Sequence, residues 1–472
     1  MKLAAIEPKE VLGFFEEISA IPRGSGNTEA IADYLVGFAK NRELAHIRDG
    51  IGNVVIFQNG TKGYENSEPL IIQGHMDMVC EKDNNSMIDM KRDGLDLYVE
   101  DGFVRAHHTS LGGDDGIALA YVLAIMDSDM PHPPIEAVFT VDEEVGMGGA
   151  SAFDASVLRG KRLLNIDSEV EGVFTAGCAG GANVNVMIPT ERVSMKGRMF
   201  VLTIEGLRGG HSGMDIDKGR ANSNLLMARL LYTLRDHIKI FELDGGTKGN
   251  AIPIYTKAVV VSDMNIADMA AQYDRIYKEE LASSDPDVEV TCSDEGMGEG
   301  MVCANTEDIL SFLIMAPNGV CSHSMEIEGL VESSLNLGVL SVRGSRLTAL
   351  YTVRSSVRSK LKWLCQQINA AALCCGGELI IDGVYLPWKY RKDSPLRKVM
   401  TEIYTEQYGR EPVVDVIHAG LECGIFEHKI KGLDAVSIGP NILDIHTTRE
   451  RLDIASVERV WKFIKELLKR LK

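Results

Sequence analysis

The sequence lacks the features that mark secreted, membrane-spanning and disulfide-linked proteins. No apolar run approaches the roughly 18 residues needed to cross a membrane. Residues 1–23 mix apolar and acidic positions at helical spacing, unlike the continuous apolar core of a signal peptide. The chain has nine cysteines but no C-x-x-C pair, so we expect reduced thiols rather than a disulfide framework. These features predict a cytoplasmic protein with no membrane attachment.

The chain also has no excess of basic residues. Its 49 Lys and Arg residues are outnumbered by 68 Asp and Glu residues, which gives a net charge of −19. An acidic surface disfavours DNA or RNA binding and leaves many carboxylates available for cations. Hydrophobic residues make up 45% and charged residues 25% of the 472 residues. These values are typical of a globular protein with two or three domains.

Strand-like and helix-like segments alternate through the first 180 residues. The strand-like segments are residues 53–58, 69–74, 135–141 and 162–166. The segments with helical periodicity include residues 28–40 and 116–126. This alternation predicts an α/β domain with a largely buried sheet. In such sheets, functional groups gather at the carboxyl ends of the strands.

From residue 184 onward the pattern changes and predicts a separate α+β domain. Its strand-like segments are residues 200–205, 258–261 and 349–354, and its helix-like segments include residues 221–237 and 267–281. Helical patterns at residues 394–409 and 452–472 then resume the first domain. We therefore predict a discontinuous first domain, residues 1–184 and 384–472, with residues 185–383 inserted as a second domain.

The stretch LIIQGHMDMVC places an imidazole and a carboxylate directly after an apolar strand. His75 and Asp77 are two residues apart, so in an extended chain they project to the same face. A histidine that binds a metal usually donates its other ring N–H to a carboxylate or carbonyl. H-x-D can supply both groups, although an isolated H-x-D is more often an ordinary polar loop. Met76, between them, is predicted to face the core.

Two further acidic motifs flank predicted strands and helices. LGGDDGIA places Asp114 and Asp115 in a glycine-rich turn before an apolar helix. Helix capping explains one of the two carboxylates, and a cation would relieve their repulsion. TVDEEVGMGGA places Glu143 and Glu144 after a strand. Besides a solvated loop, this pattern fits a metal ligand beside a general base that takes a proton from water.

Two later motifs add ligands of the same kind. LLNIDSE carries Asp167 at a strand end, and DIHTTRE carries His446 in a loop before the last helix. Together the motifs offer nitrogen and oxygen donors without thiolates. This donor set suits zinc, manganese or cobalt in a hydrolytic site.

The ordered set H-x-D, G-G-D, D-E-E-x-G, N-x-D and a late H-T resembles the M20 metallopeptidases. IPRGSGN, GHMDMVCEKD, HAGLECGIF and SIGPNILDIHTTRE narrow the resemblance to the aminoacyl-histidine dipeptidases. It covers nearly the whole chain. The resemblance implies a catalytic α/β/α sandwich with an inserted α+β lid domain.

The resemblance also implies the roles of individual residues at a two-metal site. The implied metal ligands are His75, Asp114, Glu144, Asp167 and His446. Asp114 would bridge the two ions and Asp115 would cap the helix, although the reverse stays open. Asp77 would orient the ring of His75. Glu143 would be the general base and acid.

A second set of residues is implied to bind substrate. Its members are His211, Asn250, Arg354 and Gly420. His211 would stabilise the oxyanion, and Asn250 and Arg354 would bind the carboxylate of a dipeptide, for which the planar guanidinium is well suited. Arg343 and Arg358 are alternatives for Arg354.

These inferences predict a dinuclear zinc dipeptidase that acts on Xaa-His or β-alanyl-histidine dipeptides. Cobalt or manganese could replace zinc, and the resemblance implies a homodimer. The alternatives are an M20 deacylase of N-acyl amino acids, a dinuclear phosphoesterase and a catalytically silent homologue. Cys80 receives no role.

Overall fold

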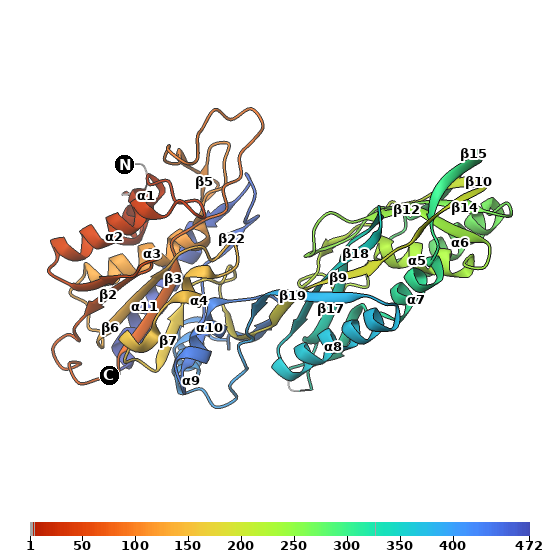
Figure 1. Cartoon of the computed structure of the whole chain (residues 1–472). Helices are drawn as coiled ribbons and strands as arrows, with labels where there is room; N and C mark the ends of the chain where they lie inside the picture. Colours follow the sequence, from red (N-terminus) through yellow and green to blue (C-terminus); the bar gives the residue numbers. More distant parts are fainter. Residues whose placement is uncertain (1–2, 4, 326) are drawn as a thin grey trace. The chain divides into compact units, whose positions relative to one another are not determined.

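The computed structural model describes residue 3, residues 5–325 and residues 327–472. The chain forms two compact units (Figure 1). Unit 1 comprises Met1–Gly177, Trp388–Val416 and Leu421–Lys472, and unit 2 comprises Cys178–Pro387 and Ile417–Gly420. The main part of unit 2 begins at Cys178 and ends at Pro387, whereas the predicted insertion was residues 185–383. The return of the four residues Ile417–Gly420 to unit 2 was not predicted.

Unit 1 is built around a mixed sheet with the strand order β1-β2-β6-β3-β7-β21-β8-β20. The strands are β1 (Ala45–Arg48), β2 (Val54–Gln58), β3 (Leu70–His75), β6 (Ile135–Thr140), β7 (Arg162–Asn165), β8 (Val173–Cys178), β20 (Val413–Ile417) and β21 (Asp434–Ser437). At its centre β3 pairs in parallel with β6 and β7, and β7 pairs in parallel with β21. The carboxyl ends of these strands therefore open onto one edge of the sheet.

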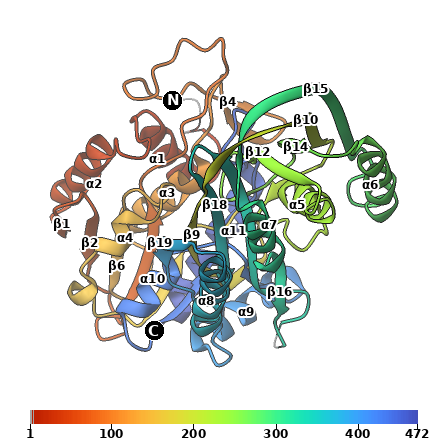
Figure 2. The same cartoon turned by 45° about the vertical axis from the view of Figure 1, so that its right-hand side comes forward.

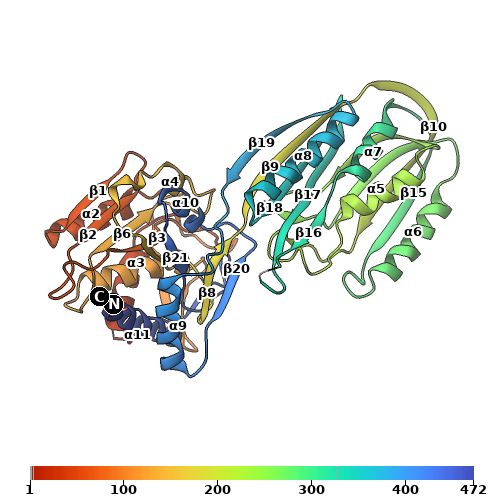
Figure 3. The ribbon, with the colours of Figure 1, turned by 90° about the horizontal axis from the view of Figure 1, so that it is seen from below.

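Helices cover both faces of this sheet (Figure 3). One face packs against α1 (Lys9–Ser19), α2 (Glu29–Asn41), α3 (Gly113–Met126), α9 (Pro395–Tyr408) and α11 (Ile454–Arg470). On the other side lie α4 (Gly148–Ala152) and α10 (Glu422–Lys429). Every residue of α3 is buried, which explains why its sequence is apolar all round. The predicted α/β fold class is confirmed.

Local sequence signals fix several of these helices. The hydroxyl of Ser394 accepts a hydrogen bond from the N–H of Arg397 at the start of α9, and Pro395 occupies the first turn. Gly409 ends α9 with φ of 69°, a conformation that glycine adopts without strain. In α11 the carboxylate of Asp453 accepts from the N–H of Ala455.

A small sheet lies beside the main one in unit 1. Its strands are β22 (Ile442–Leu443), β23 (Arg451–Asp453), β5 (Phe103–Ala106) and β4 (Leu97–Glu100), in that order. The pairing of β22 with β23 closes a loop that carries His446. This loop is therefore held at both ends.

Unit 2 is built on an antiparallel sheet, and its helices lie over one face of that sheet (Figure 3). The strand order is β15-β10-β14-β12-β17-β18-β9-β19, with β16 paired to β17. The strands are β9 (Gly180–Pro189), β10 (Arg192–Glu205), β12 (Ile238–Gly245), β14 (Thr256–Ser262), β15 (Glu289–Cys303), β16 (Gly319–His323), β17 (Val331–Arg343), β18 (Arg346–Ser355) and β19 (Glu378–Tyr385). The helices are α5 (Ser223–Thr233), α6 (Ala267–Glu280), α7 (Thr306–Met315) and α8 (Arg358–Cys374).

Helices and strands of unit 2 share one apolar core, which contains residues of α5, α7 and α8 and of the strands beneath them. Figure 2 gives a second view of these helices. A short ladder of β11 (Gly210–His211) and β13 (Ala251–Ile252) lies outside the main sheet. Within the described residues, no helix combines the length and apolarity that a membrane crossing requires.

Candidate active site

The polar motifs predicted at strand ends meet at the carboxyl edge of the parallel strands of unit 1. His75 is the last residue of β3, and Asp167 follows β7 by two residues. Glu143 and Glu144 follow β6, whose Thr140 is in register with His75. The first turn of α3, which is not helical at this residue, adds Asp114. Because adjacent parallel strands end together, residues from distant parts of the sequence share one small volume.

Asp114 lies between the two histidines. Its Oδ1 is 3.1 Å from Nε2 of His75, and its Oδ2 is 3.1 Å from Nε2 of His446. Asp167 Oδ1 lies 3.4 Å from the His75 nitrogen, and Glu144 Oε1 lies 3.0 Å from the His446 nitrogen. The result is two three-residue donor groups that share Asp114. A carboxylate with each oxygen facing a different donor group has the arrangement of a bridging ligand.

The other ring nitrogen of His75 faces Asp77. His75 Nδ1 lies 3.1 Å from the Asp77 carbonyl oxygen and 3.4 Å from its carboxylate. The buried Asp77 carboxylate also accepts hydrogen bonds from the backbone N–H groups of Glu143 and Glu144 and from the Ser25 hydroxyl. Asp77 thus orients the imidazole and the acidic loop after β6 together. Met76, between His75 and Asp77, is fully buried in the core, as predicted.

Glu143 lies within the same donor cluster as His75 and Glu144. Burial raises the pKa of its carboxyl well above the ordinary value, although His75 acts in the opposite direction. A carboxyl group with a raised pKa holds a proton more readily after accepting it from water. This property suits a group that first takes up a proton and later releases it.

The cluster has the charge distribution of a cation site. Burial raises the pKa of Asp167 to about 6. Hydrogen bonds with Asp114 and Glu144 raise the pKa of His446 to about 10. Several carboxylates are thus held together in a buried volume, where cations would relieve their repulsion. With imidazole and carboxylate oxygen donors within 4.8 Å of one another, the residues fit two divalent metal ions.

Asp115 takes a different position from Asp114. Its Oδ2 accepts a hydrogen bond from the backbone N–H of His75 at 3.1 Å, and none of the donor groups among the described residues includes it. Burial, and then the negative charge of Asp167, raises the pKa of Asp115 well above its ordinary value. Asp115 therefore ties the first turn of α3 to the end of β3. This geometry favours Asp114 as the bridging residue.

A glutamate that the sequence did not indicate holds the loop of Asp114 in place. The Glu450 carboxylate accepts hydrogen bonds from the consecutive N–H groups of Leu111, Gly112 and Gly113, at 2.7 to 2.9 Å. The N–H of Asp114 lies 3.4 Å from the same carboxylate. Glu450 is four residues beyond His446. It therefore connects the loops that carry two of the predicted ligands.

Buried Arg23 also binds the loop that contains Gly112. Its guanidinium donates to the carbonyl oxygen of Gly112 and, at 3.0 Å, to those of Met76 and Asp77. Gly112 has φ of 63°, and a Cβ there would lie 2.6 Å from the guanidinium. Only glycine suits both the conformation and the close approach.

We expect Glu450→Gln to weaken metal binding about tenfold to a hundredfold, because residues that support a ligand typically contribute this much. The amide keeps the size of the side chain but directs an NH2 group at backbone N–H donors. Metal affinity would be measured by competition with a chromophoric chelator. Glu458→Gln, at an exposed ion pair with Lys462 on α11, is the matched control. Equal metal affinity in both variants would contradict the assigned role.

Two more acidic residues near the cluster were not predicted. Glu422 is fully buried and accepts from the Thr140 hydroxyl at 2.6 Å and from the Gln73 amide at 2.5 Å. Burial raises the pKa of Glu422 to about 7. Burial, together with Asp114 and Asp167, raises the pKa of Glu169 to about 8. Both place a further carboxyl group beside the cluster, and a bound cation would favour the ionised form of each.

Unit 2 holds a separate polar cluster around His211 and Arg354. A Cβ at Gly213 would lie 3.1 Å from the His211 ring and 3.3 Å from Nε of Arg354, so both side chains border this glycine. Arg354 is 6% exposed and donates to the Tyr385 hydroxyl at 2.7 Å. Its Nε is buried without a hydrogen-bond partner among the described residues. A buried guanidinium with a spare donor fits an anionic ligand.

His418, on the returning segment Ile417–Gly420, belongs to this cluster. Its Nε2 lies 2.7 Å from the Ser334 hydroxyl. Burial, followed by the charge of Arg354, lowers the pKa of His418 to about 4. Burial also lowers the pKa of His211, again with a contribution from Arg354. Both imidazoles are thus neutral at pH 7, which leaves the guanidinium as the cation of the cluster.

The two remaining residues that were predicted to bind substrate are Asn250 and Gly420. Asn250 is exposed and its carbonyl accepts from the N–H of Ser212, next to His211. Gly420 is in the returning segment, two residues beyond His418. Of the two alternatives to Arg354, Arg343 is exposed and paired with Asp244, and Arg358 begins α8. The buried Arg354 is thus the best placed of the three arginines.

The chain matches a known family of proteins. Residues 71–470 match the model of peptidase family M20/M25/M40. The chain belongs to this family. It is therefore a hydrolase of the peptidase class. The family resemblance inferred from the sequence motifs is confirmed.

Two relatives match over nearly the full length of both chains. The cytosol non-specific dipeptidase of Escherichia coli (strain K12) is 33% identical over 480 residues, which cover 100% of this chain and 99% of the relative. The crystal structure of aminoacylhistidine dipeptidase from Vibrio alginolyticus superposes with a TM-score of 0.91 at 34% identity. That match covers 99% of this chain and 98% of the other.

The likeness to other solved M20 structures is weaker and concerns the fold alone. Human carnosine dipeptidase 1 has a TM-score of 0.52 at 12% identity. The match covers 98% of this chain and 96% of that one. The M20 fold is therefore retained where few residues are shared.

Proposed function

We propose that the protein is a dinuclear metal-dependent dipeptidase that acts on Xaa-His dipeptides and related substrates. The observation that carries this proposal is the position of Asp114, whose two oxygens face two separate donor groups, one at His75 and one at His446. The names of the two full-length relatives, a dipeptidase in each case, support the substrate class. We further propose zinc as the native metal, a cytosolic location and a homodimer.

The metal ligands in this proposal are His75, Asp114, Glu144, Asp167 and His446. Bound divalent cations would polarise the scissile carbonyl and make a water molecule more acidic. Asp77 fixes the ring of His75 so that its Nε2 is directed at the donor cluster. Asp77 also accepts from the N–H of Glu143 and so fixes the acidic loop.

Glu143 is the general base and then the general acid. Its carboxylate takes a proton from the attacking water and later gives that proton to the leaving amine. The raised pKa caused by burial favours retention of the proton between the two steps. No other proton carrier is required.

In unit 2, we propose that Arg354 and Asn250 bind the free carboxylate of the substrate and that Gly420 contributes backbone there. The buried guanidinium with its spare Nε donor supports this role for Arg354. His211 donates a hydrogen bond to the oxyanion that develops on the scissile carbonyl. A neutral imidazole can act as this donor.

A substrate panel tests the proposed function. After loading with zinc, we expect Xaa-His dipeptides to be hydrolysed with kcat/KM at least about a hundredfold above N-acetyl amino acids, because a deacylase site and a dipeptide site differ in the polar group they must accommodate. Release of free histidine would be followed by chromatography. A clear preference for N-acetyl amino acids, or for a phosphate monoester, would contradict the proposal.

A further inference from the structure

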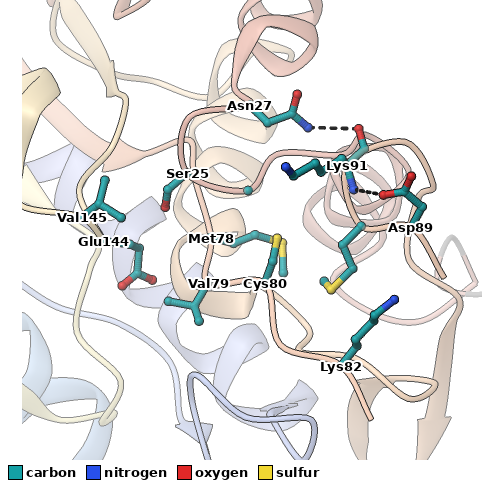
Figure 4. A pocket seen from close by; sticks show the side chains of 12 residues that line it. Ser25, Asn27, Met78, Val79, Cys80, Lys82, Asp89, Lys91, Glu144 and Val145 are labelled. Atoms are coloured by element: carbon teal, nitrogen blue, oxygen red, sulfur yellow. Dashed lines mark hydrogen bonds between the residues drawn. The ribbon is translucent and has the colours of Figure 1, made fainter. Parts of the chain in front are cut away.

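A pocket of about 430 Å³ lies in unit 1 next to the donor cluster. It is lined by parts of four segments, residues 24–27, 78–82, 89–91 and 144–145. Figure 4 shows Glu144 and Val145 on one side, Asp89 and Lys91 on the opposite side, and Met78 between them. One of the residues that line the pocket is thus a proposed metal ligand.

The part of the pocket between these sides is uncharged. Met78, Val79 and Cys80 contribute side chains there. At the far end the Asn27 amide is bonded to the Lys91 carbonyl, so it is already satisfied. Burial raises the pKa of the Cys80 thiol, which keeps it in the neutral form.

Two of the charged groups at the rim have partners. The Lys82 ammonium donates to the Ile88 carbonyl at 2.7 Å. The Asp89 carboxylate accepts from the backbone N–H of Lys91 at 3.1 Å. A ligand with a charged end would have to compete with these contacts. An uncharged side chain that packs on the sulfur and methyl groups of Met78, Val79 and Cys80 displaces none of these hydrogen bonds.

We propose that this pocket receives the side chain of the substrate residue on the amino side of the scissile bond, and that Cys80 limits its size. This inference rests on the proposed dipeptidase function. Glu144 places the pocket beside the reacting centre. The residues proposed to bind the carboxyl end of the substrate, such as Arg354, do not line this pocket, which leaves it for the other end.

The proposal narrows the substrate class. A methionine or leucine at the amino end fills the apolar part of the pocket. Glycine and β-alanine have no side chain and leave it empty. The structure therefore favours ordinary Xaa-His dipeptides with an uncharged side chain of medium size over β-alanyl-histidine.

The first test compares Cys80→Phe with the wild type on Gly-His, Ala-His and Met-His. We expect kcat/KM for Met-His to fall about tenfold or more, since even one methylene in a filled pocket is worth this much, while Gly-His changes less than about twofold. Cys374→Phe is the matched control because Cys374 is also exposed, on α8 of unit 2. It should leave the hydrolysis of all three dipeptides unaffected.

A second test avoids a permanent substitution, because Cys80 Sγ packs closely on Gly24. In a Cys321→Ala/Cys374→Ala background, which lacks the other exposed thiols, methyl methanethiosulfonate transfers a small methylthio group to Cys80, which forms a mixed disulfide and releases methanesulfinate. We expect a selective loss of Met-His hydrolysis that dithiothreitol reverses. Mass spectrometry of the digested protein confirms the site of modification.

The outcomes separate the two proposals. Selective loss for Met-His supports the subsite. An equal loss for all three dipeptides, or no loss after confirmed modification of Cys80, overturns it while the dipeptidase function stands. If the unmodified wild-type enzyme hydrolyses none of the dipeptides, the proposed function fails and the subsite fails with it.

Discussion

Replacement of Glu143 by alanine is expected to lower dipeptide turnover by about a thousandfold or more while both metal ions stay bound. General acid–base catalysis by a positioned carboxylate typically contributes 10²–10⁴-fold, and Glu143 would serve both proton-transfer steps. Metal content would be measured by mass spectrometry on the purified variant, and turnover by release of histidine. Glu143→Gln, which keeps the size of the side chain, should be similarly impaired.

Asp142→Asn is the control for this experiment. Asp142 precedes Glu143 and accepts a hydrogen bond from the N–H of Gly26 at 2.7 Å. It has φ of 55°, a conformation that asparagine tolerates well. The amide oxygen can keep this hydrogen bond, so we expect nearly normal turnover. Full activity in Glu143→Ala would refute the role assigned to Glu143.

The second large effect is expected from Asp114→Asn. An amide is a poor bridging ligand, so both donor groups would lose affinity for their ions. We expect turnover to fall about a thousandfold, which corresponds to about 4 kcal/mol in the activation free energy. Isothermal titration of the metal-free protein with zinc should show loss of one or both binding events.

Asp115→Asn is the informative partner of Asp114→Asn. The Asp115 carboxylate faces the backbone N–H of His75, and the oxygen of an asparagine can accept the same bond. We therefore expect two zinc ions to bind and turnover to fall less than about tenfold, since one hydrogen bond is retained. If Asp115→Asn instead lost zinc binding and turnover while Asp114→Asn kept both, Asp115 would be the bridging residue.

The sequence predicted the α/β fold of unit 1 because its signals are local. Residues 69–74 were predicted as a strand, and β3 spans Leu70–His75. Residues 116–126 were predicted as a helix, and α3 begins three residues earlier, at Gly113. The polar residues after each apolar run could be assigned to strand ends in the same way. Their convergence then followed from the parallel arrangement of the strands.

Residues that act through distant backbone could not be found in this way. Glu450 binds the loop at Gly112 across 338 positions of sequence, and Glu422 reaches Thr140 across 282. Both lie in motifs that support the family resemblance, HAGLECGIF and DIHTTRE, but those motifs do not show which backbone groups the two carboxylates contact. The strand β15 was also missed, because its Gly-Met-Gly-Glu-Gly segment has no strand periodicity. The structure nevertheless pairs β15 with β10.

The four-residue return of Ile417–Gly420 to unit 2 has a consequence for synthesis of the chain on the ribosome. Unit 2 cannot be completed until residue 420 has emerged, although most of it ends at Pro387. Unit 1 waits still longer, because β21 lies between β7 and β8 in its sheet. The segment between β8 and β21 must be translated first. At roughly 5–20 residues per second, this takes on the order of tens of seconds. During this time the first half of unit 1 exposes an incomplete sheet, whose unpaired strand edges and apolar surface favour aggregation.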